Sequence, residues 1–171
     1  VEEAMGAGNG TLIFTSGGTE ADNTAIFGAA RALRRRGNRI ITSAVEHPAV
    51  LECCKRLEQD GYDVVYVGVD DKCRLDLERL EDAIDENTIL VSLMQVNNEA
   101  GTIMPVDAVK DLMKKKNAPG WFHCDAVQSF GKLQVPESAD LISASSHKIH
   151  GPKGAGALFV RKGIHLPALI E

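Results

Sequence analysis

Hydrophobic residues along the chain follow two alternating patterns, that of a buried strand and that of a helix with one apolar face. Residues 39–43, 63–67 and 88–94 are short runs rich in β-branched side chains, which is typical of strands. Between these runs, residues 19–36 and 48–59 carry apolar side chains three or four positions apart, which is typical of helices. We expect further strands at 11–14, 121–125, 141–144 and 157–160 and further helices at 77–84 and 105–116. The alternation predicts an α/β fold, a three-layer α/β/α architecture with a mostly parallel sheet.

The length and composition are those of a soluble globular domain, and we expect residues 1–171 to form a single one. The 171 residues are 44% hydrophobic and 25% charged, which is ordinary for such a domain. A net charge of −5 argues against nucleic acid as a partner, because nucleic-acid-binding surfaces are usually basic. No apolar run approaches the ~20 residues of a membrane helix, and the acidic start Val1-Glu2-Glu3-Ala4 is unlike a signal peptide. We therefore expect a cytoplasmic protein that does not bind a membrane.

The four cysteines, Cys53, Cys54, Cys73 and Cys124, form neither a CxxC pair nor a disulfide framework. Free thiols in a reducing compartment are the expected state. Cys124 is expected in the core, and the helical pair Cys53-Cys54 is expected to be half buried and half exposed. The triplet His123-Cys124-Asp125 does not predict a metal site, because successive side chains of a strand point to opposite faces of the sheet.

Polar residues follow the ends of several predicted strands, which is where ligands bind in open α/β sheets. After the first strand, Gly17-Gly18-Thr19 opens a helix, and glycines let backbone N–H groups approach an anion at a helix N-terminus. Phosphate is the anion that suits this position best, although the Gly-Lys-Ser/Thr of a Walker loop is absent. A plain glycine turn followed by a hydroxyl cap would explain the same residues.

Further polar residues stand at the ends of later strands. His47 precedes a helix, a position typical of a cap or a packed side chain, and Asn98 lies in a run of polar turn residues. Asp125 ends an apolar strand, where burial without a cationic partner is costly, and Gln128 follows it. Lys148 comes directly after another strand, where a partly dry amine becomes nucleophilic. Together with the phosphate cradle, this set suits a phosphorylated aromatic aldehyde with a basic ring nitrogen.

In this order, the motifs resemble those of the NifS/IscS-type cysteine desulfurases. That group belongs to the class V aminotransferases, among the fold-type I enzymes that depend on pyridoxal 5′-phosphate (PLP). The resemblance extends from about Thr11 to Val160, although many members carry alanine at the position of Gly18 and glycine at that of Ser146. The motifs that carry it are Ser16-Gly17-Gly18-Thr19-Glu20-Ala21-Asp22-Asn23, Glu46-His47, Val96-Asn97-Asn98-Glu99, Asp125-Ala126-Val127-Gln128-Ser129 and Ser146-His147-Lys148-Ile149-His150-Gly151-Pro152-Lys153-Gly154.

The resemblance implies a role for each residue in the catalytic centre. Lys148 would form the Schiff base with PLP and later move protons between the substrate and the cofactor. Asp125 would face the pyridine nitrogen and keep it protonated. His47 would stack on the ring and take part in acid–base steps. These residues imply a PLP-binding site whose catalytic residues are Lys148 and His47.

The resemblance also implies how the cofactor is held. Gln128 would hydrogen-bond the phenolic oxygen, and Asn98 would orient the ring and the substrate. Lys153 and Lys162 compete with Lys148 for the role of the reactive lysine, but both are expected to be structural or solvated. The residues expected to hold the phosphate are Gly18, Thr19, Ser145 and His147.

The family's reaction removes sulfur from L-cysteine, giving L-alanine and an enzyme persulfide. The resemblance implies L-cysteine as the substrate, a sulfur-acceptor protein such as an iron–sulfur scaffold or a tRNA thiolation pathway, and a homodimeric full-length protein. In the family, the nucleophilic cysteine and the arginine that binds the substrate carboxylate come well after the lysine, and none of the four cysteines here matches. We therefore expect residues 1–171 to be the PLP-binding large domain, without the N-terminal segment and the C-terminal small domain, and inactive alone.

Two other readings fit the same sequence. The first keeps the cofactor and changes the reaction, to that of a selenocysteine lyase or another class V aminotransferase-like enzyme. The second is a non-catalytic α/β binding module that has lost PLP. A visible absorption band that appears with PLP and disappears in Lys148→Ala separates the second reading from the others.

Overall fold

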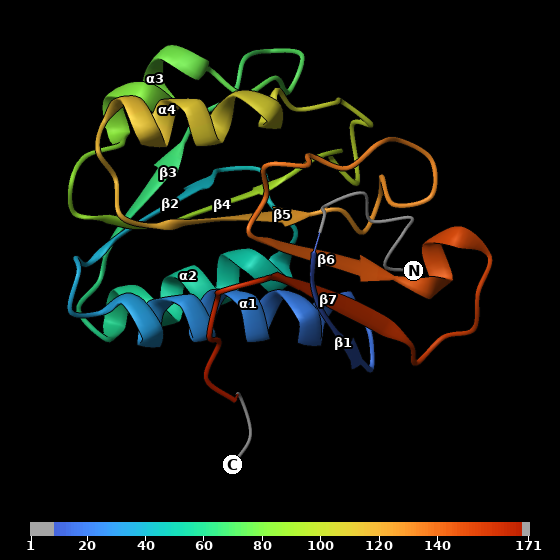
Figure 1. Ribbon diagram of the computed structural model, residues 1–171. Coiled ribbons are helices and arrows are strands. Elements are labelled where there is room, and N and C mark those ends of the chain that lie inside the picture. The colour runs from blue at the N-terminus through green and yellow to red at the C-terminus, as the bar shows by residue number, and fades with distance from the viewer. Residues whose placement is uncertain (1–8, 169–171) are drawn as a thin grey trace.

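A computed structural model describes residues 9–168, which form a seven-stranded sheet between two layers of helices (Figure 1). The strands are β1 (Gly10–Thr15), β2 (Arg39–Ser43), β3 (Asp63–Val67), β4 (Thr88–Met94), β5 (Trp121–Asp125), β6 (Leu141–Ser145) and β7 (Gly156–Arg161). The helices are α1 (Gly18–Leu33), α2 (Pro48–Gln59), α3 (Leu77–Ala83) and α4 (Val109–Lys115), with 3₁₀ turns η2 (Val106–Ala108) and η3 (Ser146–Ile149).

The strands lie in the order β1-β7-β6-β5-β4-β2-β3. Strands β3, β2, β4, β5 and β6 are parallel, and β7 is antiparallel to both of its neighbours, β6 and β1. Because β1 and β6 both run opposite to β7, the carboxyl end of β1 lies at the same edge of the sheet as the carboxyl ends of the parallel strands. The predicted mostly parallel sheet is confirmed, and one edge gathers the residues that follow five of its strands.

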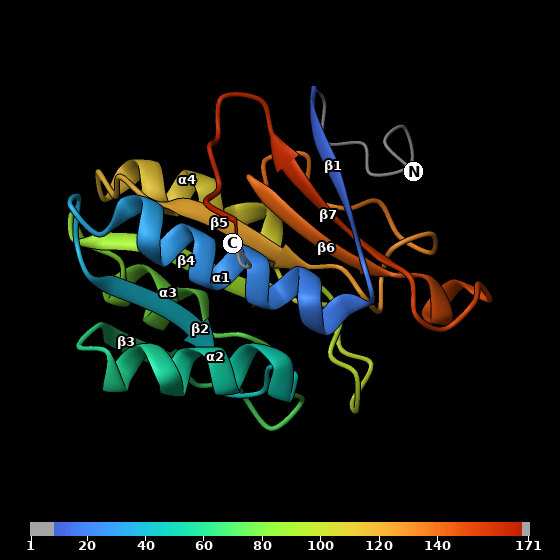
Figure 2. The same cartoon turned by 90° about the horizontal axis from the view of Figure 1, so that it is seen from below.

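The two helix layers bury the two faces of the sheet. Helices α1 and α2 cover one face, and α3 and α4 cover the other (Figures 1 and 2). All seven residues of β4 are buried, as expected of a strand that is covered on both sides. The predicted three-layer α/β/α architecture is confirmed. Among the helices of residues 9–168, none is long and apolar enough to cross a membrane.

Several local predictions differ from the structure. Helix α1 ends at Leu33, three residues before the expected end at Arg36. The helix expected at 105–116 does not begin at Pro105, because the backbone of that residue (φ −79°, ψ 54°) is not helical. The expected helix is instead the 3₁₀ turn η2 followed by α4, which ends at Lys115. The pair Cys53-Cys54 is fully buried rather than half exposed, because α2 packs against both α1 and the sheet. Cys124 lies in the core as predicted.

Candidate functional site

A cavity of about 210 Å³ lies at the edge of the sheet where β1, β2, β4, β5 and β6 end. It brings together eight of the nine residues that the sequence predicts for the site. The ninth, Ser145, is buried beside the cavity and does not line it. The eight predicted residues in the lining are Gly18, Thr19, His47, Asn98, Asp125, Gln128, His147 and Lys148.

The N-terminus of α1 forms one wall of the cavity. Gly17 precedes the helix in an extended conformation, and no side chain caps the first turn. Glu20 instead reaches back out of the helix, where its Oε2 atom accepts hydrogen bonds from Ser16 N at 2.7 Å and Ser16 Oγ at 2.6 Å. An uncapped helix N-terminus presents free N–H groups and positive partial charge, so this wall is suited to an anion.

His47 caps α2 and also lines the cavity, so the structural and the functional readings of this residue both apply. Its Nδ1 atom accepts a hydrogen bond from Ala49 N at 3.1 Å, which leaves Nε2 to carry the proton of the neutral ring. Glu46 lies behind it, fully buried, and accepts hydrogen bonds from Ser43 Oγ at 2.6 Å and Met94 N at 2.9 Å. These contacts tie the end of β2 to β4 and fix the position of His47.

Burial raises the pKa of Glu46 to about 8, although the hydrogen bonds from Ser43 and Met94 oppose that shift. The carboxyl group is therefore largely protonated at neutral pH. Burial is the largest influence on the charge state of Glu46, as it is for the other acidic groups near the cavity.

The turn after β4 places Asn98 in the cavity. Asn97 is buried, and its Nδ2 group donates to Val45 O at 2.9 Å. The Oδ1 atom of Asn97 accepts hydrogen bonds from the backbone N–H groups of Glu99 and Ala100, at 3.0 and 2.8 Å. Asn97 is thus a structural residue of the turn, and it presents the exposed Asn98 to the cavity.

Asp125 ends β5 and is almost completely buried at the cavity. Its Oδ1 atom accepts a hydrogen bond from Val127 N at 2.9 Å. Burial raises the pKa of Asp125, whereas the hydrogen bond from Val127 and the nearby His47 lower it. A buried carboxyl group with acceptor capacity to spare fits a cationic N–H group of a ligand.

Lys148 lies on η3, which a set of backbone hydrogen bonds holds in place. Ser146 N donates to Ala155 O at 3.1 Å, and Gly151 N donates back to Ser146 O at 2.9 Å. These bonds close the loop over residues 151–155, so the turn holds the segment that carries the lysine. The rival lysines, Lys153 and Lys162, are exposed and outside the lining of the cavity.

Ser145 and His147 act as a pair at the base of η3. The Ser145 Oγ atom lies 2.7 Å from His147 Nδ1, so the buried hydroxyl orients the exposed ring. Ser145 therefore reaches the cavity through His147. A direct contact between Ser145 and a bound phosphate stays a prediction.

The cavity also contains one acidic residue that sequence reasoning missed, Asp22 of α1. It is 2% exposed, on a helix whose other buried residues include Ala21, Ala25 and Ile26. The signal in the sequence that could have identified Asp22 is an aspartate placed beside the apolar face of a predicted helix. The other missed lining residues, Met94, Val96 and Val127, carry apolar side chains and offer packing surface.

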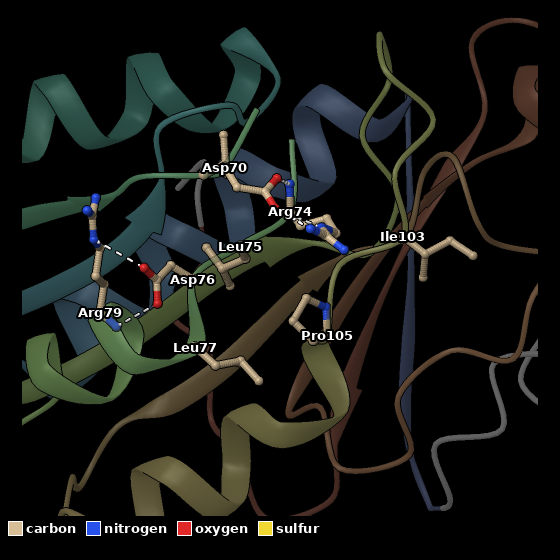
Figure 3. Close-up of a pocket in the computed structure, with 9 residues that line it drawn as sticks. Asp70, Arg74, Leu75, Asp76, Leu77, Arg79, Ile103 and Pro105 are labelled. Carbon is tan, nitrogen blue, oxygen red and sulfur yellow. Dashed lines mark hydrogen bonds and ion pairs between the residues drawn. The ribbon is translucent and has the colours of Figure 1, made fainter. Parts of the chain in front are cut away.

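A second hollow, of about 580 Å³, lies between the start of α3 and the residues before η2 (Figure 3). Its charged side chains are paired with one another. Arg74 Nη2 lies 2.7 Å from Asp70 Oδ2, and Arg79 Nε lies 3.2 Å from Asp76 Oδ2, while Asp76 Oδ1 caps α3 (Figure 3). These groups stabilise the loop and the helix start, so this larger hollow is the weaker candidate for a site.

Comparisons with known proteins agree on one family. The family model described as aminotransferase class-V matches residues 1–168. The putative cysteine desulfurase IscS 1 of Bacillus subtilis is 45% identical over 169 residues, which cover 97% of this chain and 44% of that protein. The cysteine desulfurase IscS of Clostridium botulinum is 44% identical over 174 residues, covering 100% of this chain and 43% of that protein.

Solved structures give the same result. A structure titled NifS-like protein superposes with a TM-score of 0.89 at 45% identity, over 94% of this chain and 45% of the other. A structure titled SspA in complex with cysteine superposes with a TM-score of 0.85 at 38% identity, over 93% of this chain and 47% of the other. The chain thus spans less than half the length of the relatives it matches.

Proposed function

Because this chain belongs to the class V aminotransferase family, whose cysteine desulfurase members depend on PLP, we propose that it is the cofactor-binding domain of a cysteine desulfurase. The proposed domain comprises residues 1–171, as one part of a longer enzyme. One observation carries the proposal. A single cavity contains an amine, a buried carboxyl group and an uncapped helix N-terminus, contributed by Lys148, Asp125 and α1.

The chemistry of these groups fits PLP. The N-terminus of α1, with Gly18 and Thr19, suits the phosphate, and His147 lines the same cavity. The buried Asp125 suits a protonated ring nitrogen, and Gln128 suits the phenolic oxygen. When bound, PLP supplies an electron sink for the bonds at the α-carbon of an amino acid.

The chain's own residues would position the reacting groups and move the protons. Lys148 Nζ would be the site of covalent attachment, and once released it would be the base that takes up a proton and returns it. His47 would cover one face of the ring, with its Nε2 proton available. Asn98 would orient the ring and the substrate. Support for these roles comes from the shared cavity and from the rigid turns that hold η3 and the loop after β4.

We propose L-cysteine as the substrate, with L-alanine and a persulfide as products. Support comes from the relatives named cysteine desulfurase and from the neighbour whose title names a complex with cysteine. The name IscS favours delivery of the sulfur to an iron–sulfur scaffold protein or a tRNA thiolation pathway. We further propose that the full-length enzyme is a homodimer and lies in the cytoplasm.

The sulfur-accepting thiol is proposed to lie outside this chain. Cys53, Cys54 and Cys124 are buried, and Cys73 is half buried in a turn. None of the four lines the cavity. The chain alone should then bind PLP without turning over L-cysteine.

The test uses the full chain with added PLP. A visible absorption band should appear with PLP, disappear in Lys148→Ala and survive in Lys153→Ala, the matched lysine outside the cavity. L-Alanine release from L-cysteine should be absent. A missing band, or a band that survives Lys148→Ala, would contradict the cofactor site, and robust persulfide formation by the chain would contradict its role as a part of the enzyme.

A further inference from the structure

Asp22 is a buried acidic residue at the cavity that none of the proposed roles uses. It lies on α1, is 2% exposed, and lines the cavity together with Asp125. Its Oδ1 atom is buried and has no hydrogen-bond partner among residues 9–168. A buried carboxylate oxygen that accepts no hydrogen bond is costly, so the presence of Asp22 at this position requires a reason.

His123 does not supply the missing positive charge. Its Nε2 atom lies 3.6 Å from Asp22 Oδ1, but the ring is fully buried on β5. Both ring nitrogens already lie 2.8 Å from hydroxyl groups, those of Ser92 and Ser143. Burial lowers the pKa of His123 to about 3, so the ring is neutral at neutral pH.

The basic groups that line the same cavity as Asp22 are His47 before α2 and His147 and Lys148 on η3. The ionisable groups that act on Asp22 from neighbouring elements are acidic. They are Asp125 on β5, Glu46 before α2, and the thiol of Cys53 on α2, whose pKa burial raises to about 12. Burial, followed by the influence of Asp125 and Glu46, raises the pKa of Asp22 well above its usual range, and a hydrogen bond from Ser143 only opposes that shift. Two neighbouring carboxyl groups in so dry a site do not ionise together.

We propose that Asp22 is a positioning residue that keeps one proton on the Asp22–Asp125 pair, so that Asp125 alone faces the ring nitrogen as a negative charge. Hydrogen bonds decide which partner holds the proton. Asp125 Oδ1 accepts from Val127 N at 2.9 Å, whereas Asp22 Oδ1 accepts from none. Asp22 would then be neutral, Asp125 negative and the protonated ring nitrogen positive, so the three groups together would carry no net charge. The inference rests on the proposed function for the ring nitrogen, but the shared proton belongs to the chain itself.

Infrared spectroscopy of the full chain at neutral pH tests the shared proton directly. Labelling aspartate with ¹³C at the carboxyl carbon separates its bands from those of glutamate, so Glu46 does not interfere. The wild type should show a labelled band of a protonated carboxyl group, with and without PLP. That band should be lost in Asp22→Asn and kept in Asp125→Asn. No such band in the wild type, or one lost only in Asp125→Asn, would overturn the inference.

A second measurement needs no assignment of bands. A carboxyl pKa that is raised in the folded state means that stability falls as pH rises from the ordinary carboxyl range toward the raised value. Asp22→Asn cannot ionise, so its melting temperature should exceed that of the wild type by a margin that widens with pH. A constant or narrowing margin contradicts the inference. A chain that shows the labelled band but never binds PLP would contradict the proposed function instead.

Discussion

At the scale of single residues, buried carboxyl groups give the site its electrostatic character. Asp22, Glu46 and Asp125 are each at least nine-tenths buried around one cavity. Burial makes the ionised form of each group costly, and the cost is only partly offset by hydrogen bonds. Such clusters of shifted carboxyl groups are typical of functional sites, because a stable core would use apolar residues instead.

Glu46 offers a prediction on stability and pH. The pKa of Glu46 rises from 4.5 to about 8 on folding, so the wild type should lose stability as pH rises from about 4.5 to about 8. Each pKa unit corresponds to about 1.4 kcal/mol, which makes the total loss a few kcal/mol. Glu46→Gln, which stays neutral and can still accept from Met94 N, should show a flatter profile. Urea denaturation at several pH values measures the difference.

The matched control for Glu46 is the exposed Glu86. Glu86→Gln should follow the stability profile of the wild type, since the exposed side chain of Glu86 has no packing to lose. If Glu46→Gln follows the wild-type profile throughout, Glu46 is ionised in the folded protein and the account of its environment is wrong.

The cysteines offer a second prediction. Burial raises the pKa of Cys53 and Cys54 to about 12, and Cys124 is completely buried, so their thiolates are scarce and inaccessible. A thiol-alkylating reagent should therefore modify Cys73 first in the native chain and the other three only on unfolding. Mass spectrometry of the labelled peptides measures the order. Fast labelling of Cys124 in the native chain would contradict the core assignment.

At the scale of elements, the junction of β1 and α1 depends on a close approach of two backbones. Gly156, at the start of β7, pairs with Thr15, and a Cβ atom placed on it would lie 2.6 Å from the backbone carbon of Gly17. The backbone of Gly17 cannot move aside in the way that the end of a flexible side chain can. Gly17 itself has extended backbone and open space where its Cβ would lie.

These two glycines make a matched pair of variants. Gly156→Ala should push the first turn of α1 away, at a cost of about 1–3 kcal/mol in stability and with weaker binding of PLP. Gly17→Ala should change stability by no more than about 0.5 kcal/mol. Chemical denaturation and titration with PLP measure both effects. Equal effects of the two substitutions would show that the close approach to Gly17 does not shape the anion site.

The elements themselves were largely predictable, and the exceptions have physical causes. Strands such as β4 could be predicted because unbroken runs of β-branched and apolar residues are typical of buried strands. The 3₁₀ turn η3 was not predicted, because it depends on tertiary hydrogen bonds such as Ser146 N to Ala155 O. The antiparallel placement of β1 beside β7 is likewise decided by packing between segments far apart in sequence.

At the scale of the whole molecule, the sheet brings the site together. Residues that follow β1, β2, β4, β5 and β6 meet at one edge because those strands end there. Positions after strands therefore identified seven of the eight predicted lining residues, and the resemblance to the desulfurase family added His147. The sequence could not show that Ser145 is buried outside the lining, or that Asp22 lines the same cavity as Asp125, since both depend on how α1 and η3 pack on the sheet.

The most direct test of the central claim is to find where PLP attaches. The chain is loaded with PLP and treated with borohydride, which makes a linkage between lysine and cofactor permanent, and its peptides are then mapped by mass spectrometry. If Lys148 forms the Schiff base, the added mass lies on the peptide that contains Lys148, at a position distinct from Lys153. Attachment at Lys153 or Lys162, or no attachment at all, would contradict that role of Lys148.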